Sequence, residues 1–294
     1  MFRLAHISDV HLAPLPQPGI GQLFNKRITG YLNWQRRKHN LVEGILERLI
    51  EDLKAKEPDH LAITGDLINL SLPAEIENAA KFLEQTGDPD WVTAIMGNHD
   101  AYVAGAREKA IAAWQPYLSG DGSALESVQA YPVLRKRGDV SIIACNSAIT
   151  TPPFFATGKA GEDQLHRLAN MLAELDGTCR VLLIHHPPFG NATPFMKRLI
   201  DADRFRNVVA NSGAELILHG HTHLDTLTSI DGKGNKVPVV CVPAAGQAPG
   251  GHKPAAGYNL FNIDKKGDEF SITLDKFRYS ENSDKPVHAG NFEL

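Results

Sequence analysis

The sequence has few cysteines and no long apolar run. Cys145, Cys179 and Cys241 are odd in number and form no C-x-x-C pair, which argues against a disulfide framework and favours a reducing compartment. No uncharged apolar stretch is long enough to span a membrane, and the first residues lack the apolar region of a signal peptide. We therefore expect a cytoplasmic protein without a membrane-spanning segment.

Positive charge is not in excess either. Lys and Arg number 30 against 34 Asp and Glu, a formal net charge of -4. Binding long nucleic acid through phosphates needs clustered excess Lys and Arg, so that class of function is disfavoured. A length of 294 residues with 43% hydrophobic residues is ample for a globular core.

Short β-branched runs alternate with longer segments of helical period, which is typical of an α/β fold. Predicted strands are 3–8, 60–64, 91–95, 140–145, 180–184 and 215–218. Predicted helices are 40–56, 74–85, 103–116, 161–175 and 194–211. Later strands at 225–230, 237–242, 258–263 and 270–278 predict a second, largely antiparallel sheet. The polar residues 280–294 are expected to form an extended or frayed tail.

Residues 13–40 fit neither pattern. Three prolines lead into apolar and aromatic residues mixed with Lys and Arg, so the segment reads as an insertion after the first strand. Three interpretations stay open: simple packing on the body, a cap over the chemistry at that sheet edge, and a basic amphipathic surface that contacts a membrane or a partner subunit.

Five polar clusters follow five of the predicted strands. They are Asp9-Val10-His11, Gly65-Asp66, Gly97-Asn98-His99-Asp100, His185-His186-Pro187-Pro188 and Gly220-His221-Thr222-His223. Loops after the carboxyl ends of strands share one edge, so these clusters are expected to form one site. The mixture of Asp, Asn and His suits a pair of divalent ions, and a single Asp after a strand would otherwise be read as a cap or turn residue.

Spacing adds a constraint on two of these clusters. Alternate residues of an extended chain point the same way, so Asp9 with His11, and His221 with His223, could each offer two ligands to the cluster. Glycines just before the ligands suit tight turns and close backbone approach.

The ordered pattern D-x-H, G-D, G-N-H-D, H and G-H-x-H over residues 9–223 resembles the calcineurin-like metallophosphoesterase superfamily. Within it, Ile7-Ser8-Asp9-Val10-His11-Leu12, the HHPP block and the Gly-rich stretch 246–257 are most similar to class III cyclic-nucleotide phosphodiesterases and related glycerophosphodiesterases. The resemblance implies the metallo-dependent phosphatase fold, a four-layer αββα sandwich of two mixed sheets.

The same resemblance implies two divalent metal ions, Mn, Fe, Zn or Co. One ion would be held by Asp9, His11, Asp66 and His223, and the other by Asp66, Asn98, His185 and His221. Asp66 would bridge them, and a hydroxide between the ions would attack the phosphorus.

The resemblance also implies roles for residues beside these ligands. His99 is expected to protonate the leaving oxygen or to stabilise phosphoryl charge, and Asp100 to orient its ring. His185 is taken as the ligand of the HHPP block, which leaves His186 lining the pocket. His186 and His252 are candidate substrate contacts.

The prediction is a metallophosphoesterase domain over 1–280 with a tail at 281–294, acting as a phosphodiesterase on a cyclic nucleotide or glycerophosphodiester. A phosphomonoesterase, a pyrophosphate hydrolase acting on a lipid-linked nucleotide, and a non-catalytic scaffold are the alternatives. Expected partners are a small phosphodiester, no long nucleic acid, a peripheral membrane surface touched by 13–40, and a second copy of the chain in a homo-oligomer.

Overall fold

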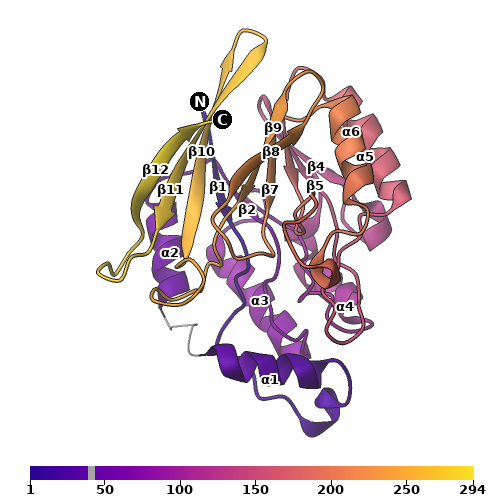
Figure 1. The fold of residues 1–294 in the computed structure, drawn as a ribbon, viewed down its shortest axis with the longest axis vertical. Coiled ribbons are helices and arrows are strands. Elements are labelled where there is room, and N and C mark those ends of the chain that lie inside the picture. The colour runs from indigo at the N-terminus through magenta and orange to yellow at the C-terminus, as the bar shows by residue number, and fades with distance from the viewer. Residues whose placement is uncertain (39–43) are drawn as a thin grey trace.

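Two six-stranded mixed sheets stand face to face in the computed structural model, which describes residues 1–38 and 44–294 (Figure 1). The first sheet has the order β12-β11-β10-β1-β2-β3. Its strands are β1 (Phe2–Ile7), β2 (His60–Ile63), β3 (Val92–Ala94), β10 (Gly257–Lys266), β11 (Glu269–Arg278) and β12 (Val287–Glu293). β1, β2 and β3 are parallel, whereas β10 to β12 run antiparallel to their neighbours.

The second sheet has the order β4-β5-β6-β7-β9-β8. Its strands are β4 (Val133–Arg137), β5 (Val140–Ala144), β6 (Cys179–Leu183), β7 (Leu216–His219), β8 (Leu227–Asp231) and β9 (Lys236–Cys241). The run from β5 to β9 is parallel, with antiparallel strands at both edges.

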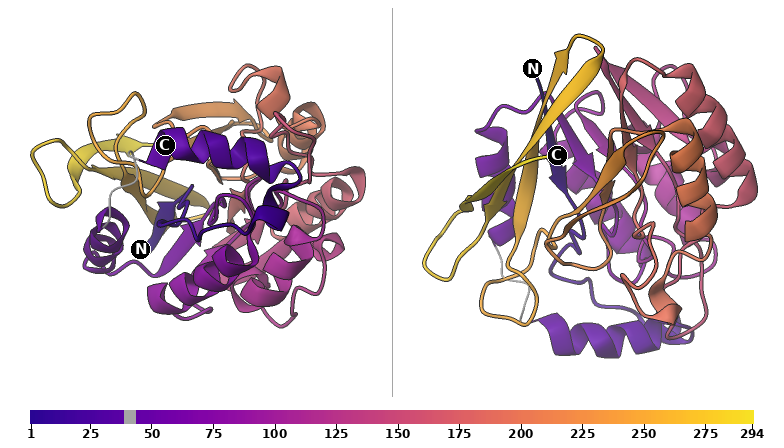
Figure 2. Two further views of the ribbon diagram at one scale, coloured as in Figure 1. Left: turned by 90° about the horizontal axis from the view of Figure 1, so that it is seen from below. Right: turned by 45° about the horizontal axis from the view of Figure 1, so that its top comes forward.

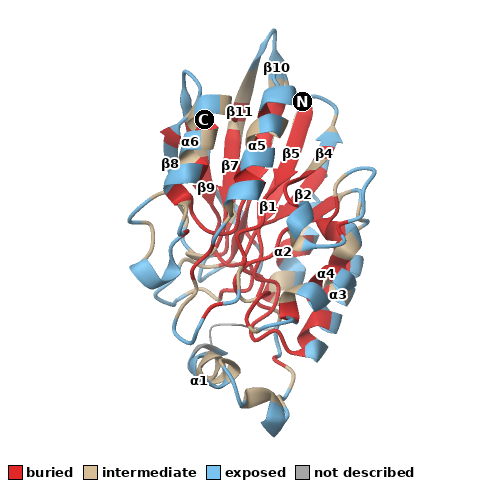
Figure 3. Cartoon of the chain, turned by 90° about the vertical axis from the view of Figure 1, so that its right-hand side faces the viewer, coloured by how far each residue is buried: buried red, intermediate tan, exposed pale blue. Residues whose placement is uncertain are grey.

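Helices cover the outer faces of both sheets, as the buried strands between exposed helix surfaces show in Figure 3. The described helices are α1 (Arg27–Arg37), which lies apart from these faces, α2 (Ile45–Lys54), α3 (Pro73–Thr86), α4 (Ala106–Leu118), α5 (Glu162–Glu174) and α6 (Ala202–Ser212), with short 3-10 turns at Ile20–Leu23, Val128–Ala130 and Phe195–Lys197. α2, α3 and α4 lie on the side of the first sheet, and α5 and α6 on the second. The predicted four-layer αββα sandwich is confirmed.

Alternation along the strands assigns each side chain to a layer. In β5, Ile142 belongs to the core between the sheets, whereas its neighbour Ile143 packs under α5 and α6. β6 and β7 repeat the alternation, with Leu182 and Ile217 pointing to the helices. Strands buried on both faces read as continuous apolar runs, which is why the sequence revealed them.

The later strands do not form a sheet of their own, so that expectation was wrong. β8 and β9 extend the second sheet beside β7, whereas β10 crosses back to pair with β1 of the first sheet. Apolar alternation identifies a strand but not its partner, because any strand with one apolar face satisfies the same pattern.

The expected tail is also corrected. Within 280–294, residues Val287–Glu293 form β12, which pairs antiparallel with β11 from Val287 opposite Arg278 to Glu293 opposite Thr273. The residues of this edge strand are mostly exposed, and a strand without a buried apolar face leaves no alternation to detect.

Two predicted helices have different bounds. The predicted helix 194–211 divides into the turn Phe195–Lys197 and α6, and β4 was not predicted. The predicted helix 40–56 appears as α2, which begins at Ile45; residues 39–43, including the start of that prediction and the end of 13–40, lie outside the described residues.

The described part of the inserted segment, 13–38, crosses the ends of both sheets. Viewed from below, α1 lies across the edge of the sandwich (Figure 2). Tyr31 and Trp34 pack against a small cluster of Leu15, Leu70, Leu72 and Tyr102. Over residues 1–38 and 44–294, no helix combines the length and apolar character that crossing a membrane requires.

Candidate metal centre

The sequence-predicted ligands converge where strands of both sheets end. They follow β1 (Asp9, His11), β2 (Asp66), β3 (Asn98), β6 (His185) and β7 (His221, His223). The two sheets also touch here, because Ser8 pairs with Ala244 in an isolated bridge beyond β1. The predicted convergence of these clusters at one edge of the fold is confirmed, and the edge is shared between the two sheets.

The paired ligands do not lie on extended chain, which corrects the basis of the spacing argument. Asp9 and His11 have φ angles of 51° and 46°, and His221 and His223 have 69° and 56°. Left-handed conformations are uncommon for residues other than Gly and are kept where surrounding structure enforces them. The chain therefore turns sharply at each ligand, and His221 and His223 aim at different groups.

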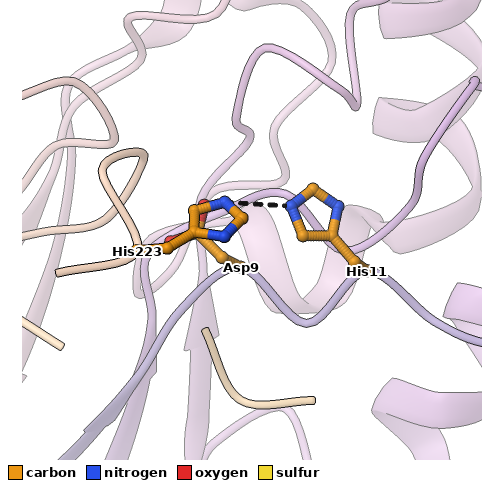
Figure 4. Close-up of side chains that lie close together, drawn as sticks. All are labelled: Asp9, His11 and His223. Carbon is orange, nitrogen blue, oxygen red and sulfur yellow. Dashed lines mark hydrogen bonds and ion pairs between the residues drawn. The ribbon is translucent and has the colours of Figure 1, made fainter. Parts of the chain in front are cut away.

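Asp9, His11 and His223 form the first group (Figure 4). The Nε2 atoms of His11 and His223 lie 3.3 Å apart, and His223 Nε2 lies 3.2 Å from Asp9 Oδ1. The Asp9 carboxylate also accepts the backbone N–H of His221, at 3.0 Å to Oδ2, which ties the β1 loop to the β7 loop.

Asp66, Asn98, His185 and His221 form the second group. Asp66 Oδ2 lies 3.3 Å from His185 Nε2 and 3.9 Å from His11 Nε2, so this carboxylate stands between the two groups. Asn98 Oδ1 lies 2.7 Å from His221 Nδ1 and 3.3 Å from His185 Nε2.

Three of the imidazoles each donate a hydrogen bond from one ring nitrogen to a backbone carbonyl. Nδ1 of His11 donates to Ile68 O (3.2 Å), Nδ1 of His185 to Thr64 O (2.7 Å) and Nε2 of His221 to Lys197 O (2.8 Å). A carbonyl can only accept, so each bond fixes the tautomer and turns the lone pair of the other nitrogen towards the cluster. Carbonyl bonds of this kind orient the histidine ligands of metal sites.

Burial and charge act in opposite directions on the acids. Burial tends to raise the pKa of Asp9, but His223 and His185 outweigh it and hold that pKa below its usual range. Asp66 behaves likewise: burial opposes ionisation, yet His185 and His99 hold its pKa well below normal. Both carboxylates are therefore ionised.

The pKa values of the histidines shift in opposite directions, depending on the charges around each ring. Burial lowers the pKa of His221 to about 3, and burial with the nearby His99 holds the pKa of His11 well below normal. At His185 burial would lower the pKa, but the Asp66 and Asp9 carboxylates raise it to about 9. Neutral His11 and His221 are in the form that binds a metal.

The donor set fits divalent metal ions. Lone-pair atoms of Asp66, Asn98 and the imidazoles face one another at 2.7 to 3.9 Å. The ring protons of His11 and His221 point to Ile68 O and Lys197 O, so the nitrogens of these two rings that face the other donors carry no proton. Such convergence of acceptors suits two ligands of one cation and is costly otherwise. The groups Asp9–His11–His223 and Asp66–His185–His221 each bring their donor atoms within 4.8 Å of one another.

His99 faces the same space from the β3 loop. Its Nδ1 donates to Asn69 O at 2.5 Å, and its backbone N–H donates to Asp66 Oδ1 at 2.7 Å. The ring stacks on Tyr102 and meets His11 edge-on, with centroids 5.4 and 4.8 Å away. The orientation of this ring is thus set by a carbonyl and two aromatic neighbours.

Asp100 holds backbone N–H groups in the described contacts, and its predicted role in orienting the His99 ring stays a prediction. Its carboxylate accepts the backbone N–H groups of Asp66 (2.9 Å), Gly97 (2.7 Å) and Ile68 (3.2 Å). Burial, followed by the charge of Asp66, raises the pKa of Asp100 to about 8. Asp100 fastens the β2 loop to the β3 loop and thereby places their ligands.

The two candidate substrate contacts are not brought to the site. His186 is fully buried, with Nδ1 2.8 Å from Ser147 Oγ and Nε2 donating to Ala156 O. Its ring packs 4.4 Å from that of His221 and supports this ligand from behind. His252 is exposed in the loop after β9 and does not line the cavity described below.

A cavity of about 540 Å³ opens beside the metal-ligand candidates. Asp66, Asn98, His99, His221 and His223 line it on one side, and Lys26, Thr29, Asn33 and Arg36 of the inserted segment on the other. This volume matches a small-molecule site. The inserted segment therefore forms one wall of the cavity.

Lys26 was missed as a site residue. Its Nζ donates to Thr151 Oγ1 (2.7 Å) and Phe155 O (2.9 Å) and lies 4.4 Å from the centroid of the Tyr102 ring. Burial lowers its pKa to about 8, although Asp66 opposes the shift. The basic character of 13–40 was visible in the sequence, but nothing singled out this lysine.

Only a glycine fits at position 65, where the loops after β2 and β3 pass close to each other. Gly65 has φ of 94°, and a Cβ there would lie 2.6 Å from the Gly97 nitrogen and 2.8 Å from His185 Nδ1. Any side chain at Gly65 would push the β2 and β3 loops apart.

A two-sheet α/β sandwich with Asp, Asn and His donors gathered at the shared edge defines a scaffold for a metal-dependent hydrolase. Residues 2–225 match the model of the calcineurin-like phosphoesterase family, and the chain belongs to that family. It is therefore a metal-dependent phosphoric ester hydrolase.

One curated relative supports the family, and two solved structures support the fold. The chain is 30% identical over 219 residues to a protein of Synechococcus sp. named a probable cyclic nucleotide phosphodiesterase, and the alignment covers 74% of this chain and 76% of that protein. Purple acid phosphatase from yellow lupin seeds matches 99% of this chain with a TM-score of 0.63 and 13% identity. Sulfate thiohydrolase SoxB of Thermus thermophilus matches 92% with a TM-score of 0.50 and 15% identity. The chain spans about half of these two longer structures, at 53% and 55%, and the likeness is one of fold.

Proposed function

We propose that the chain hydrolyses a small phosphodiester, a cyclic nucleotide or a glycerophosphodiester, with two divalent metal ions. The observation that carries the proposal is the position of the Asp66 carboxylate, 3.3 Å from His185 Nε2 and 3.9 Å from His11 Nε2, between two groups of donors. A carboxylate so placed suits a bridge between ions. The Synechococcus relative named a probable cyclic nucleotide phosphodiesterase supports the same substrate class.

The ligand sets are proposed from the same geometry. Asp9, His11, Asp66 and His223 would hold one ion, and Asp66, Asn98, His185 and His221 the other. Two divalent ions in such a site polarise a phosphoryl oxygen and lower the pKa of water. Ligands of this type accept Mn, Fe, Zn or Co, so the metal in the cell depends on supply.

The protein residues around the ions then have separate tasks. His99 lines the cavity with Nδ1–H donating to Asn69 O, so the ring donates to the leaving oxygen from Nε2 when it is in the doubly protonated, imidazolium form. Lys26 and Arg36, on the opposite wall, attract the anionic substrate. The inserted segment acts as a cap that orients the substrate against the metal edge.

The alternatives differ in what they need from this site. A non-catalytic scaffold needs none of the ligands, yet each ligand of the motif is present and pointed inward. A phosphomonoesterase or a pyrophosphate hydrolase would use the same edge, so the choice among these esters requires kinetics. The cytoplasmic location and a homo-oligomer stay predictions.

The experiment is to measure kcat/KM of the purified Mn²⁺-supplemented protein on an activated aryl phosphodiester and on the matching monoester, with the metal content of the same sample. We expect clear preference for the diester, followed by turnover of a cyclic nucleotide or glycerophosphodiester. Preference for the monoester would replace the proposal by a phosphatase, and an inert protein without metal would favour the scaffold.

A further inference from the structure

The rim of the metal cavity carries large apolar side chains that face solvent. Phe24, Ile28 and Leu32 follow one another at intervals of four residues, and their side chains are 83%, 51% and 58% exposed. Ile28 and Leu32 lie about one turn apart on α1, and Phe24 lies in the turn that precedes this helix; these three side chains are called the apolar stripe. Phe154 and Phe195, on loops of the second sheet, are exposed to a similar degree.

These loops and α1 form one continuous surface. Lys26, just before α1, donates to the carbonyl of Phe155, and Ala156 N–H donates to Met196 O. Leu32 and Phe154 both line the cavity while remaining exposed, so the apolar rim surrounds its opening.

α1 has three distinct sides. Tyr31 and Trp34 pack on the body, and Arg36 faces the cavity with Asn33. Phe24 and Ile28 face solvent and belong to neither of these two sides, whereas Leu32 is exposed at the cavity wall. A helix that only packed on the body or only closed the cavity would need no second apolar side.

The charge of this surface is opposite to that of the whole protein. Residues 13–38 contain five Lys or Arg and no Asp or Glu. Residues 187–200 contain two Lys or Arg and again no Asp or Glu, although the chain as a whole is acidic. Arg36, Lys38, Lys197 and Arg198 are all exposed. Exposed aromatic and aliphatic side chains interleaved with basic ones are typical of segments that lie in the interface of an anionic membrane.

We propose that the surface formed by residues 20–38, 154–155 and 195–198, here called the rim surface, docks on an anionic lipid bilayer. The apolar stripe enters the headgroup region while the basic side chains contact lipid phosphates. The cavity then opens towards the bilayer. A nucleic acid would match the charge but leave the apolar stripe unused, and a second copy of this chain would oppose basic surface to basic surface.

Vesicle co-sedimentation tests this without using activity. Vesicles of phosphatidylcholine with phosphatidylglycerol are compared with vesicles of phosphatidylcholine alone, at low and high salt. We expect binding of the wild-type protein to the anionic vesicles only, and its loss at high salt, because lipid charge is screened beyond about 10 Å at 0.1 M salt.

Two double variants address the two parts of the surface. Phe24→Ser with Ile28→Ser removes apolar contact, and Lys38→Glu with Arg198→Glu reverses charge; each is expected to lower the partition coefficient about tenfold or more. The matched controls are Leu227→Ser with Val287→Ser and Lys109→Glu with Lys233→Glu, which change exposed side chains elsewhere. The controls should bind like the wild type.

Several outcomes overturn the proposal. Failure of the wild type to bind anionic vesicles does so, as does equal binding to both lipids or unchanged binding of the rim variants. Sedimentation velocity without lipid is the remaining arm. If the wild type is a dimer that Phe24→Ser with Ile28→Ser dissociates, the rim surface is an interface between copies instead.

Discussion

The metal edge and the inserted segment beside it line the same cavity but are built by opposite means. At the metal edge, Asp9, Asp66 and His185 are almost fully buried, and each is held by several hydrogen bonds or ion pairs. In the inserted segment, Phe24 and Leu32 are mostly exposed, and the segment is attached through a few contacts such as those of Lys26. Chemistry needs fixed ligands, whereas a cap or docking surface needs only attachment.

Substitution of the central carboxylate gives the largest expected effect. Asp66→Ala removes the carboxylate that stands between both groups, so kcat/KM should fall about 1,000-fold or more and metal content should drop, because both proposed ions would depend on it. Metal analysis and steady-state kinetics measure this. Asp268→Ala, in an exposed turn, is the control; retention of both ions by Asp66→Ala would contradict the bridging position.

His99→Ala should affect turnover without affecting metal. We expect kcat to fall about 100- to 1,000-fold, since the variant loses the proposed proton donor while the candidate ligands stay in place. The metal content should match that of the wild type and of the control His166→Ala, which changes an exposed histidine. Full activity of His99→Ala would remove its proposed role, and loss of metal would make it a ligand.

Gly65→Ala tests the tight crossing of the ligand loops. The added Cβ would lie 2.6 Å from the Gly97 nitrogen, so the free energy of unfolding should fall by about 1–3 kcal/mol. Urea unfolding measures the change. Gly122→Ala is the control, because Gly122 also has positive φ but has open space around it. Equal losses would mean that backbone strain, and not the collision, limits this position.

Lys26 should give the smallest effect, because its proposed role is to attract and orient the substrate and not to perform chemistry. Lys26→Met should lower kcat/KM about tenfold with little change in metal content. With its pKa lowered to about 8 by burial, Lys26 is charged below pH 8 and loses its charge above it. The wild type should therefore lose kcat/KM above pH 8, whereas Lys26→Arg keeps its charge and should not.

The same lysine makes a prediction for stability. In the unfolded chain its pKa returns to 10.5, so between pH 8 and 10.5 the unfolded state binds more protons and stability rises with pH. Lys26→Met should lack that contribution to the rise. Parallel pH curves for the two proteins would show that Lys26 is not buried as the structure describes.

The contrast between the two regions also explains what the sequence could predict. Asp66, Asn98 and His221 were found because each follows a strand whose continuous apolar run is unmistakable. Spacing alone misled, because Asp9 and His11 sit in left-handed turns that no residue pattern reveals. The partners of their rings, such as Ile68 O and Thr64 O, are backbone atoms and carry no sequence signal at all.

Outside the site, the sequence predicted most elements but not how they associate. β10 is clear from its alternation, yet its pairing with β1, about 250 residues earlier, depends on contacts that local pattern does not encode. β12 was hidden because its exposed residues carry no apolar face. Lys26 is one of several basic residues in the inserted segment. Only the fold shows that its side chain is the one that reaches Thr151 and Phe155.

The hydrogen bonds that join the loops of the two sheets affect how the protein folds. Asp9 accepts from the backbone of His221 across 212 positions of sequence, and His185 reaches Thr64 across 121, so each group of candidate ligands combines residues of both sheets. Contacts between residues so distant in sequence form slowly, because a long chain segment must close before they do. In refolding, secondary structure should return before activity, and recovery of activity would then report the docking of the two sheets.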